Sequence, residues 1–294
     1  MKKTATSGPD RQTQQQKIVL IVDRTELMPL AEAQPALGAF LNLLQLGDQF
    51  AVLGYRGLVS RIFPKLGLAT YDERQVLDDA TNALIATSAG GTASNLRAAL
   101  RAGARLLAKK PTPKSMVLVA ASPWNRGGDP LEDLPDVPVE TIALGDHGQQ
   151  ETLRAIAAGT GGEYNFAVDP AALLNILLDL VESMGIAQIL GVGSRTVGNH
   201  QSYSLVGRVS AGTPMATFLV FWGDPAITYG SGSGPRWVTA DLLDPDGKPV
   251  TRSPDWASDG FAVFSIPDPA AGSWTLGATF VGPGNCRFTN AVLA

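Results

Sequence analysis

The sequence predicts an α/β domain with a doubly wound, mostly parallel sheet, followed by an all-β antiparallel sandwich. Up to about residue 184, short continuous apolar runs alternate with segments of helical period, which is typical of parallel strands covered on both faces. Beyond that point the period changes to two, and turn sequences separate the runs. We therefore expect a disordered polar tail at 1–16, an α/β domain at 17–184, a linker at 185–200 and a sandwich at 201–294, with a separate core in each domain.

The first half alternates five expected strands with five expected helices. The last helix has the clearest start, because Asp169 is a natural N-cap and Pro170 fits the first helical position. Leucine and alanine residues recur at helical spacing in all five helices. The expected strands are 17–23, 50–55, 116–121, 139–144 and 163–168, and the expected helices are 36–46, 71–87, 93–110, 150–159 and 169–184.

The second half contains six apolar runs with period-two alternation. Turn sequences such as DPDGKP, SPDWASDG and PDPAAG separate them, and no stretch has a convincing helical period. Short strands with such turns fit a sandwich of roughly 100 residues. The segment GSGSGP at 230–235 predicts an exposed loop between two strands. The expected strands are 203–209, 215–222, 236–243, 260–266, 272–280 and 286–293.

Composition excludes several classes of function. The chain has 294 residues and a formal net charge of −4 without a basic stripe, so we expect no nucleic-acid partner. A single cysteine, Cys286, permits no intrachain disulfide and no zinc cluster. No run approaches the roughly 18 apolar residues of a membrane span, and the first 16 residues lack the apolar core of a signal peptide. As written, the sequence predicts a soluble, cytoplasmic protein.

Four motifs occur in the order and at the spacing of the von Willebrand factor A-type domain, which the first half resembles. KIVLIVDRT at 17–25 matches the first strand and its metal loop, and LQLGDQFAVLGY at 44–55 matches the second strand with its preceding turn. The Gly-Gly-Thr loop and its helix are similar to 86–107, and the closing strand-helix-strand-helix is similar to 140–177. The resemblance implies the doubly wound fold that the periodicity predicts independently.

An A-type domain followed by a sandwich is similar to the calcium-activated chloride channel regulators and their bacterial relatives. The residues that carry this second resemblance are the Asp-Pro-Asp-Gly turn at 244–247 and the Pro-x-x-Gly-x-Trp stretch at 269–274. The metalloprotease domain of the animal members is not expected, because the sequence has no His-Glu-x-x-His motif. This resemblance implies a possible place at the cell surface.

The resemblance also implies a metal-ion-dependent adhesion site, with oxygen ligands from three loops. Asp23 matches its first ligand, Thr25 matches the second with the hydroxyl kept, and Thr92 matches the threonine of the second loop. The alternative for these three residues is a hydrogen-bonded remnant that caps the following helices.

Two positions depart from the family pattern. Leu27 stands where a further hydroxyl ligand is expected, and the carboxylate of the third loop falls on Ala121 or Ser122. Mg²⁺ requires about six oxygens in nearly octahedral geometry. We therefore expect no cofactor, or at most weakly bound Mg²⁺.

These observations predict a non-enzymatic module for adhesion or scaffolding that binds another protein. The expected contact surface is the carboxyl edge of the A-type sheet, with Asp23, Thr92, Ser122 and Trp124. Trp124 follows the third loop, where it is either an aromatic anchor for the partner or packed against its own loop. A small-molecule substrate is not expected.

Two rival functions remain open at this point. One is a genuine Mg²⁺-dependent adhesin whose partner supplies the missing carboxylate. The other is a hydrolase that uses Asp23, Asp146 or His147, but the sequence shows no nucleophile with a base in a known arrangement. We therefore assign no catalytic residue.

Overall fold

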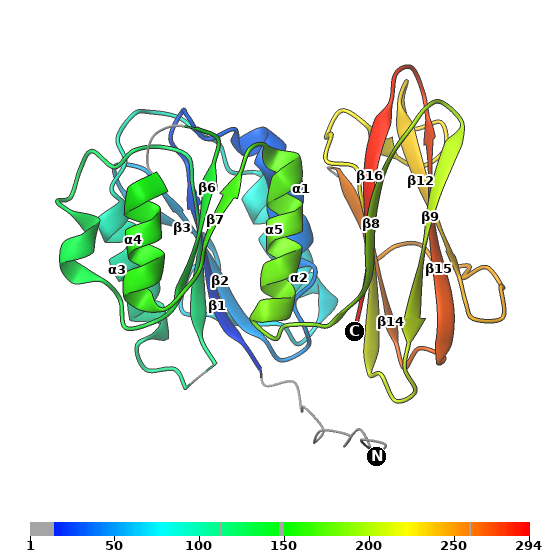
Figure 1. Ribbon diagram of the computed structural model, residues 1–294, viewed down its shortest axis with the longest axis horizontal. Coiled ribbons are helices and arrows are strands. Elements are labelled where there is room, and N and C mark those ends of the chain that lie inside the picture. The colour runs from blue at the N-terminus through cyan, green and yellow to red at the C-terminus, as the bar shows by residue number, and fades with distance from the viewer. Residues whose placement is uncertain (1–14, 112, 147–149, 259) are drawn as a thin grey trace, which may run out of the picture.

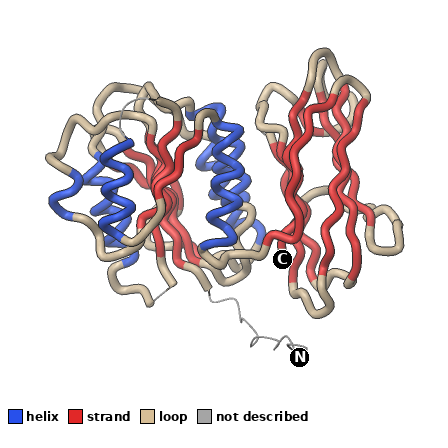
Figure 2. The backbone as a smooth tube through the Cα atoms, in the orientation of Figure 1, coloured by secondary structure: helices blue, strands red, loops and turns tan. Residues whose placement is uncertain are grey.

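The computed structural model describes residues 15–111, 113–146, 150–258 and 260–294. The tail expected at 1–16 lies almost entirely outside the described residues. The chain forms two layered parts that lie side by side (Figure 1). The first part is a sheet covered by helices on both faces, and the second is a pair of facing sheets (Figure 2). The predicted fold class is confirmed.

The first sheet has the strand order β3-β2-β1-β5-β6-β7, and β4 pairs with β2. The pairs β1–β2, β1–β5, β5–β6 and β6–β7 are parallel, whereas β3 and β4 are antiparallel to β2. Sequence patterns missed β3 and β4, which are short and only partly buried. The strands are β1 Lys17–Asp23, β2 Gln49–Tyr55, β3 Val59–Phe63, β4 Ala69–Thr70, β5 Ser115–Ala120, β6 Val139–Leu144 and β7 Tyr164–Ala167.

Helices α3 and α4 cover one face of this sheet, and α1, α2 and α5 cover the other (Figure 1). The predicted cap of α5 is confirmed, since Asp169 Oδ1 accepts a hydrogen bond of 2.8 Å from the Ala172 N–H. None of the helices in the described ranges is long and apolar enough to cross a membrane. The helices are α1 Leu30–Leu41, α2 Arg74–Ile85, α3 Leu96–Leu107, α4 Gln150–Thr160 and α5 Pro170–Ser183, with a 3₁₀ turn η1 at Pro130–Asp133.

The second part consists of two facing sheets, in the orders β13-β14-β10-β16-β8 and β11-β12-β15-β9. All their pairings are antiparallel except β11–β12. A separate apolar core fills the space between the two sheets. The strands are β8 Ile189–Val197, β9 Gln201–Val209, β10 Met215–Phe221, β11 Thr228–Tyr229, β12 Trp237–Leu243, β13 Trp256–Ser258, β14 Phe261–Pro267, β15 Gly272–Val281 and β16 Cys286–Leu293.

The linker expected at 185–200 is wrong for most of its length, because Ile189–Val197 is strand β8 and pairs with β16. The glycines in and near this segment suggested flexibility, but they have a packing role. A Cβ at Gly207 of β9 would lie 2.6 Å from the side chain of Val292, and one at Gly193 would lie 2.2 Å from the Tyr203 hydroxyl. Glycine is therefore required where the two sheets approach each other.

The expectation of separate cores holds for the space between the two sheets of the second part, but the core of the first part extends beyond it. One face of the β10–β14–β16 sheet packs against α1 and α5, and both belong to a single buried cluster. A Cβ at Gly38 of α1 would lie 3.0 Å from the Phe261 ring, and one at Gly260 would lie 2.8 Å from Pro35. Burial of Pro35 against Gly260 accounts for a proline inside α1, where the sequence suggested a helix boundary.

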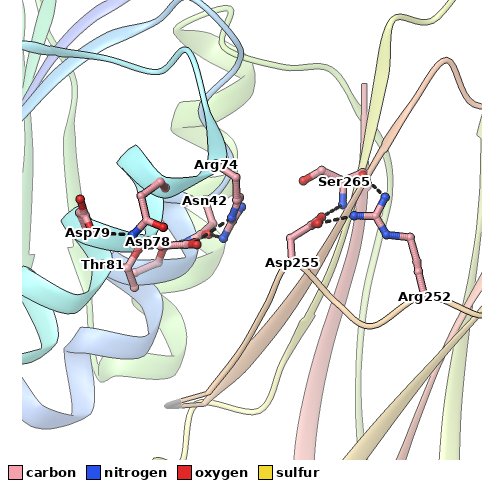
Figure 3. Close-up of polar contacts among 10 residues, drawn as sticks. Asn42, Arg74, Asp78, Asp79, Thr81, Arg252, Asp255 and Ser265 are labelled. Carbon is pink, nitrogen blue, oxygen red and sulfur yellow. Dashed lines mark hydrogen bonds and ion pairs between the residues drawn. The ribbon is translucent and has the colours of Figure 1, made fainter.

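Polar contacts flank this interface on both sides (Figure 3). On the helical side, Asn42 Nδ2 donates to the Thr81 hydroxyl at 2.9 Å, which ties α1 to α2. On the sheet side, the Asp255 carboxylate pairs with Arg252 and accepts the Ser265 N–H. The hydrogen bonds and ion pairs of each network lie within its own part, so the contact between the parts depends mainly on apolar packing.

We predict that Phe261→Ala lowers the free energy of unfolding by about 3–5 kcal/mol, because it empties a fully buried site between the two parts. The two parts should still unfold in one transition, since they share a core. Chemical denaturation followed by tryptophan fluorescence measures both quantities. Val206→Ala is the control, as Val206 is 57% exposed and should change stability by about 0.5 kcal/mol or less. Two separate transitions in the parent protein would contradict the shared core.

Asp48 makes stability depend on pH. It is 3% exposed, and its two oxygens accept the N–H groups of Gln16 (2.8 Å) and Gln45 (2.9 Å). Burial is the largest influence and raises the pKa of Asp48 to about 6, although both hydrogen bonds and Lys17 act in the opposite direction. The folded state therefore holds this proton in a pH range where the unfolded chain has already lost it.

We predict that this group lowers stability by about 2–3 kcal/mol as pH rises from about 4 to about 6, because the folded state binds more protons across that window. Above about pH 6 its contribution is constant. Urea denaturation of the parent and of Asp48→Asn at several pH values isolates the effect, since the variant cannot titrate at this position. Equal pH slopes for the two proteins would contradict it.

Candidate functional site

The candidate site lies at the carboxyl edge of the first sheet, where the neighbouring strands β2, β1 and β5 end. Asp23 is the last residue of β1 and stands in register with Tyr55, the last residue of β2. The loop after β5 begins with Ala121 and Ser122. All four residues are buried, so the strands bring one carboxylate and two hydroxyl-bearing side chains together under the loops.

The Asp23 carboxylate is completely buried and is held by backbone N–H groups from two loops. Oδ1 accepts from Thr25 at 2.8 Å, while Oδ2 accepts from Ala121 at 3.1 Å and from Ser122 at 2.8 Å. A buried carboxylate is costly unless such donors compensate its charge. Asp23 therefore fixes the loops after β1 and β5 to each other.

The hydroxyls of Thr25 and Ser122 lie beside this carboxylate and hydrogen bond to each other. Both side chains are nearly inaccessible, with 1% and 3% exposure. Of the residues that the sequence pointed to, the structure thus brings Asp23, Thr25 and Ser122 into one cluster.

Thr92 does not join this cluster. It is exposed, and its carbonyl accepts a hydrogen bond of 2.7 Å from the Asn125 side chain. The residue that reaches the buried region is Ser94, two positions later, immediately before the N-cap Asn95 of α3. A reading based on the Gly-Gly-Thr motif missed Ser94, and its place next to a helix cap was the signal that could have found it.

Ser94 and Tyr55 are two further buried residues with hydroxyl groups near the Asp23 carboxylate. Within the described residues, neither hydroxyl makes a hydrogen bond of ordinary geometry, although the two groups lie near each other. Burial raises the pKa of Tyr55 well above its ordinary value, and the nearby Asp23 charge raises it further, whereas the Ser94 hydroxyl acts in the opposite direction. Tyr55 is therefore a neutral hydroxyl next to the carboxylate.

A family model described as the von Willebrand factor type A domain matches residues 16–166, which covers the sheet and its loops. The chain belongs to the von Willebrand factor type A family. Among curated proteins, none matches this chain.

Several solved structures are similar to this chain at low sequence identity. The chain is similar to a von Willebrand factor type A protein from Catenulispora acidiphila, with 15% identity, a TM-score of 0.54, and 92% of this chain and 59% of that chain covered. It is also similar to proximal thread matrix protein 1 from the mussel byssus, with 15% identity, a TM-score of 0.47, and 63% and 50% covered. BatB from Bacteroides thetaiotaomicron gives 13% identity, a TM-score of 0.45, and 57% and 98% covered.

The first two of these proteins are considerably longer, since this chain spans 59% and 50% of their lengths. At these identities the likeness shows the fold and does not transfer a ligand or a partner.

The oxygen donors of Asp23, Thr25 and Ser122 are engaged in hydrogen bonds within the fold. The carboxylate of Asp23 already accepts three hydrogen bonds, and the hydroxyls of Thr25 and Ser122 are bonded to each other. Leu27 offers no oxygen and is 44% exposed. Across the described ranges, no group of three or more His, Cys, Asp and Glu side chains is placed to hold a metal.

The remaining candidates of the sequence reading have ordinary surroundings. Trp124 is partly buried and packs against the core under α3, which agrees with packing against its own domain. Asp146 is exposed, and the Gln150 amide lies 3.4 Å from its Oδ1. His147 lies outside the described residues.

We predict that Asp23→Ala destabilises the fold by about 3 kcal/mol, because it leaves the buried N–H groups of Thr25, Ala121 and Ser122 without their acceptor. Denaturant unfolding at neutral pH measures the loss. Glu26→Ala removes an exposed carboxylate from the same loop and should change stability by about 0.5 kcal/mol or less. Equal effects of the two substitutions would show that Asp23 does not organise the loops.

Proposed function

We propose that this A-type domain binds another protein at its carboxyl edge and that the interaction needs no metal ion. The observation that carries the proposal is the Asp23 carboxylate, whose two oxygens accept three backbone N–H groups from two loops. Domains of this family generally act as non-enzymatic interaction modules. The loops are therefore preorganised as a binding surface by internal hydrogen bonds, where related domains use a cation.

The buried cluster of Asp23, Thr25 and Ser122 holds the loops in place and does not itself contact the partner. A cation at the edge would share the Asp23 carboxylate with three N–H groups and would compete with the hydrogen bond between the hydroxyls of Thr25 and Ser122. Mg²⁺ dehydrates reluctantly and demands nearly octahedral geometry, so it gains little from ligands that are already bonded elsewhere. Leu27 then serves as an exposed apolar contact on the surface above the cluster.

The second part of the chain extends this proposal toward a role in adhesion or scaffolding. The order of A-type domain and sandwich remains a resemblance to the bacterial relatives of the calcium-activated chloride channel regulators, and it favours a place at the cell surface. The packing of β14 on α1 supports a single rigid unit that presents the carboxyl edge.

One observation favours a second candidate, the Mg²⁺-dependent adhesin. Ser94 adds a buried hydroxyl near Tyr55, which itself lies near Asp23, so this edge holds more oxygen donors than the sequence suggested. A carboxylate from the partner would have to complete the set. Metal dependence of stability separates the two candidates.

We predict that Mg²⁺ at millimolar concentration leaves the melting temperature of the parent unchanged. The double variant Leu27→Ser with Ser122→Asp should gain cation-dependent stability, because it restores a hydroxyl and a carboxylate at the loops around Asp23. Position 122 is the better place for the carboxylate, since the Ser122 side chain already faces Thr25. Differential scanning calorimetry with and without Mg²⁺ measures both proteins.

A matched variant, Leu27→Ser with Ser204→Asp, introduces the same groups but places the carboxylate on the second part of the chain, and it should not respond to Mg²⁺. If the parent itself melts higher with Mg²⁺ and Asp23→Asn abolishes this shift, the metal-dependent adhesin is correct and the metal-free proposal is wrong.

Binding at the carboxyl edge can be tested by blocking it. The native Cys286 is buried, and burial raises the pKa of its thiol to about 12, so it is unreactive at neutral pH. Leu27→Cys therefore introduces a single reactive thiol at the edge, to which a bulky maleimide can be coupled. Peptides selected for binding from a random displayed library should lose binding to the blocked protein. The same block at Val206→Cys, on the second part of the chain, should have no effect.

A further inference from the structure

The loop of residues 88–94 lies at the centre of the carboxyl edge and is held by arginines from two neighbouring loops. Arg24 donates from Nε and Nη2 to the Ser88 carbonyl at 3.1 and 3.0 Å. Arg56 donates from Nη1 to the Gly90 carbonyl at 3.4 Å. Partial burial, and secondly the positive charge of Arg56, lower the pKa of Arg24, so the two guanidinium groups feel each other's charge.

A third arginine stands on the other side of the same loop. The Arg126 backbone N–H donates to the Ser94 carbonyl at 3.1 Å, which fixes the start of the third loop against the second. The side chains of Arg56 and Arg126 are exposed, and no carboxylate of the described residues pairs with either. We call Arg24, Arg56 and Arg126 the basic rim.

The acidic side chains near this edge do not neutralise the basic rim. The loop segments 24–28, 56–58, 88–94 and 122–126 contain three arginines and only one acidic residue, Glu26. The next acidic residues along the chain that pair with arginine use arginines of α3: Glu132 with Arg97 at 2.7 Å and Asp133 with Arg101 at 2.5 Å. Asp129, three residues after Arg126, and Asp146, two residues after β6, form no ion pair with the basic rim among the described residues. The guanidinium groups of Arg56 and Arg126 therefore remain available to a charged partner.

Two exposed leucines accompany the arginines. Leu27 is 44% exposed and Leu58 is 82% exposed at the tip of the turn between β2 and β3. Leu27 lies in the loop that carries Arg24, and Leu58 lies in the turn that carries Arg56. In that turn, the Arg56 backbone N–H donates to the Leu58 carbonyl at 3.1 Å. An apolar side chain beside a guanidinium suits a partner that presents an apolar side chain next to an acidic one.

We propose that the protein partner presents an aspartate or glutamate side chain to Arg56 and Arg126, with an adjacent apolar side chain packed against Leu27 and Leu58. The inference rests on the proposed binding function of this edge and adds the chemistry of the partner. Guanidinium groups bind carboxylates through paired, charge-assisted hydrogen bonds, so a metal ion is not needed to hold the acidic group. The Arg24 guanidinium donates to the Ser60 hydroxyl and the Ser88 carbonyl, and it thereby positions the loop of residues 88–94 for this contact.

The test uses the full chain and the peptides selected from the random displayed library. We expect the selected peptides to share an acidic residue next to an apolar one, and their affinity to fall about tenfold or more when that residue is replaced by its amide. Arg56→Gln and Arg126→Gln should each weaken binding by about tenfold, and raised salt should weaken it further. Arg195→Gln, an exposed arginine of β8, is the matched control and should change nothing. Addition of EDTA should also leave the affinity unchanged.

The outcomes separate this inference from the function on which it rests. Some peptides could be blocked by the label at Leu27→Cys and yet carry no acidic residue, or bind the two arginine variants as tightly as the parent. Such peptides would overturn the acidic partner and would leave binding at this edge intact. Peptides that the label does not block overturn both. Thermal melts of the variants check that each is folded, and Arg56→Lys, which keeps the charge without the paired geometry, should recover only part of the affinity.

Discussion

The loops of the candidate site depend on one buried charge. Asp23 stands at the end of the central strand, and its carboxylate would be costly there without compensation. The N–H groups of Thr25, Ala121 and Ser122 supply that compensation and join two loops that are about a hundred residues apart in the sequence. In the metal-binding members of this fold a cation has the same organising role, so loss of one oxygen ligand at Leu27 need not loosen the edge.

The interface between the two parts provides the second constraint. The β10–β14–β16 sheet is buried on both faces, by α1 and α5 on one side and by the second sheet on the other. Small residues at Gly38 and Gly260 allow the close approach that this burial needs. A firmly attached second part holds α1 in place, and α1 follows directly on the loop of Asp23. The architecture therefore supports a preorganised surface, which lowers the entropic cost of binding a partner.

The surface above the buried cluster carries arginine and leucine side chains. Arg56 and Arg126 offer positive charge, while Leu27 and Leu58 offer apolar contact. Guanidinium groups can bind a carboxylate directly, without a metal ion. The buried hydroxyls below remain internal to the fold.

The sequence by itself determined the fold class, the alternation of strands and helices, and the end of β1 at Asp23, because hydrophobic period and cap residues act locally. It could not distinguish Thr92 from Ser94, since the choice depends on which residue of a glycine-containing loop turns toward Tyr55. It also placed a linker at β8 and separate cores in the two halves. Only the tertiary structure decided these points. A glycine in the sequence suggests flexibility until the opposing surface, which leaves no room for a side chain, is known. A strand covered on both faces has the same apolar run whichever neighbour covers it.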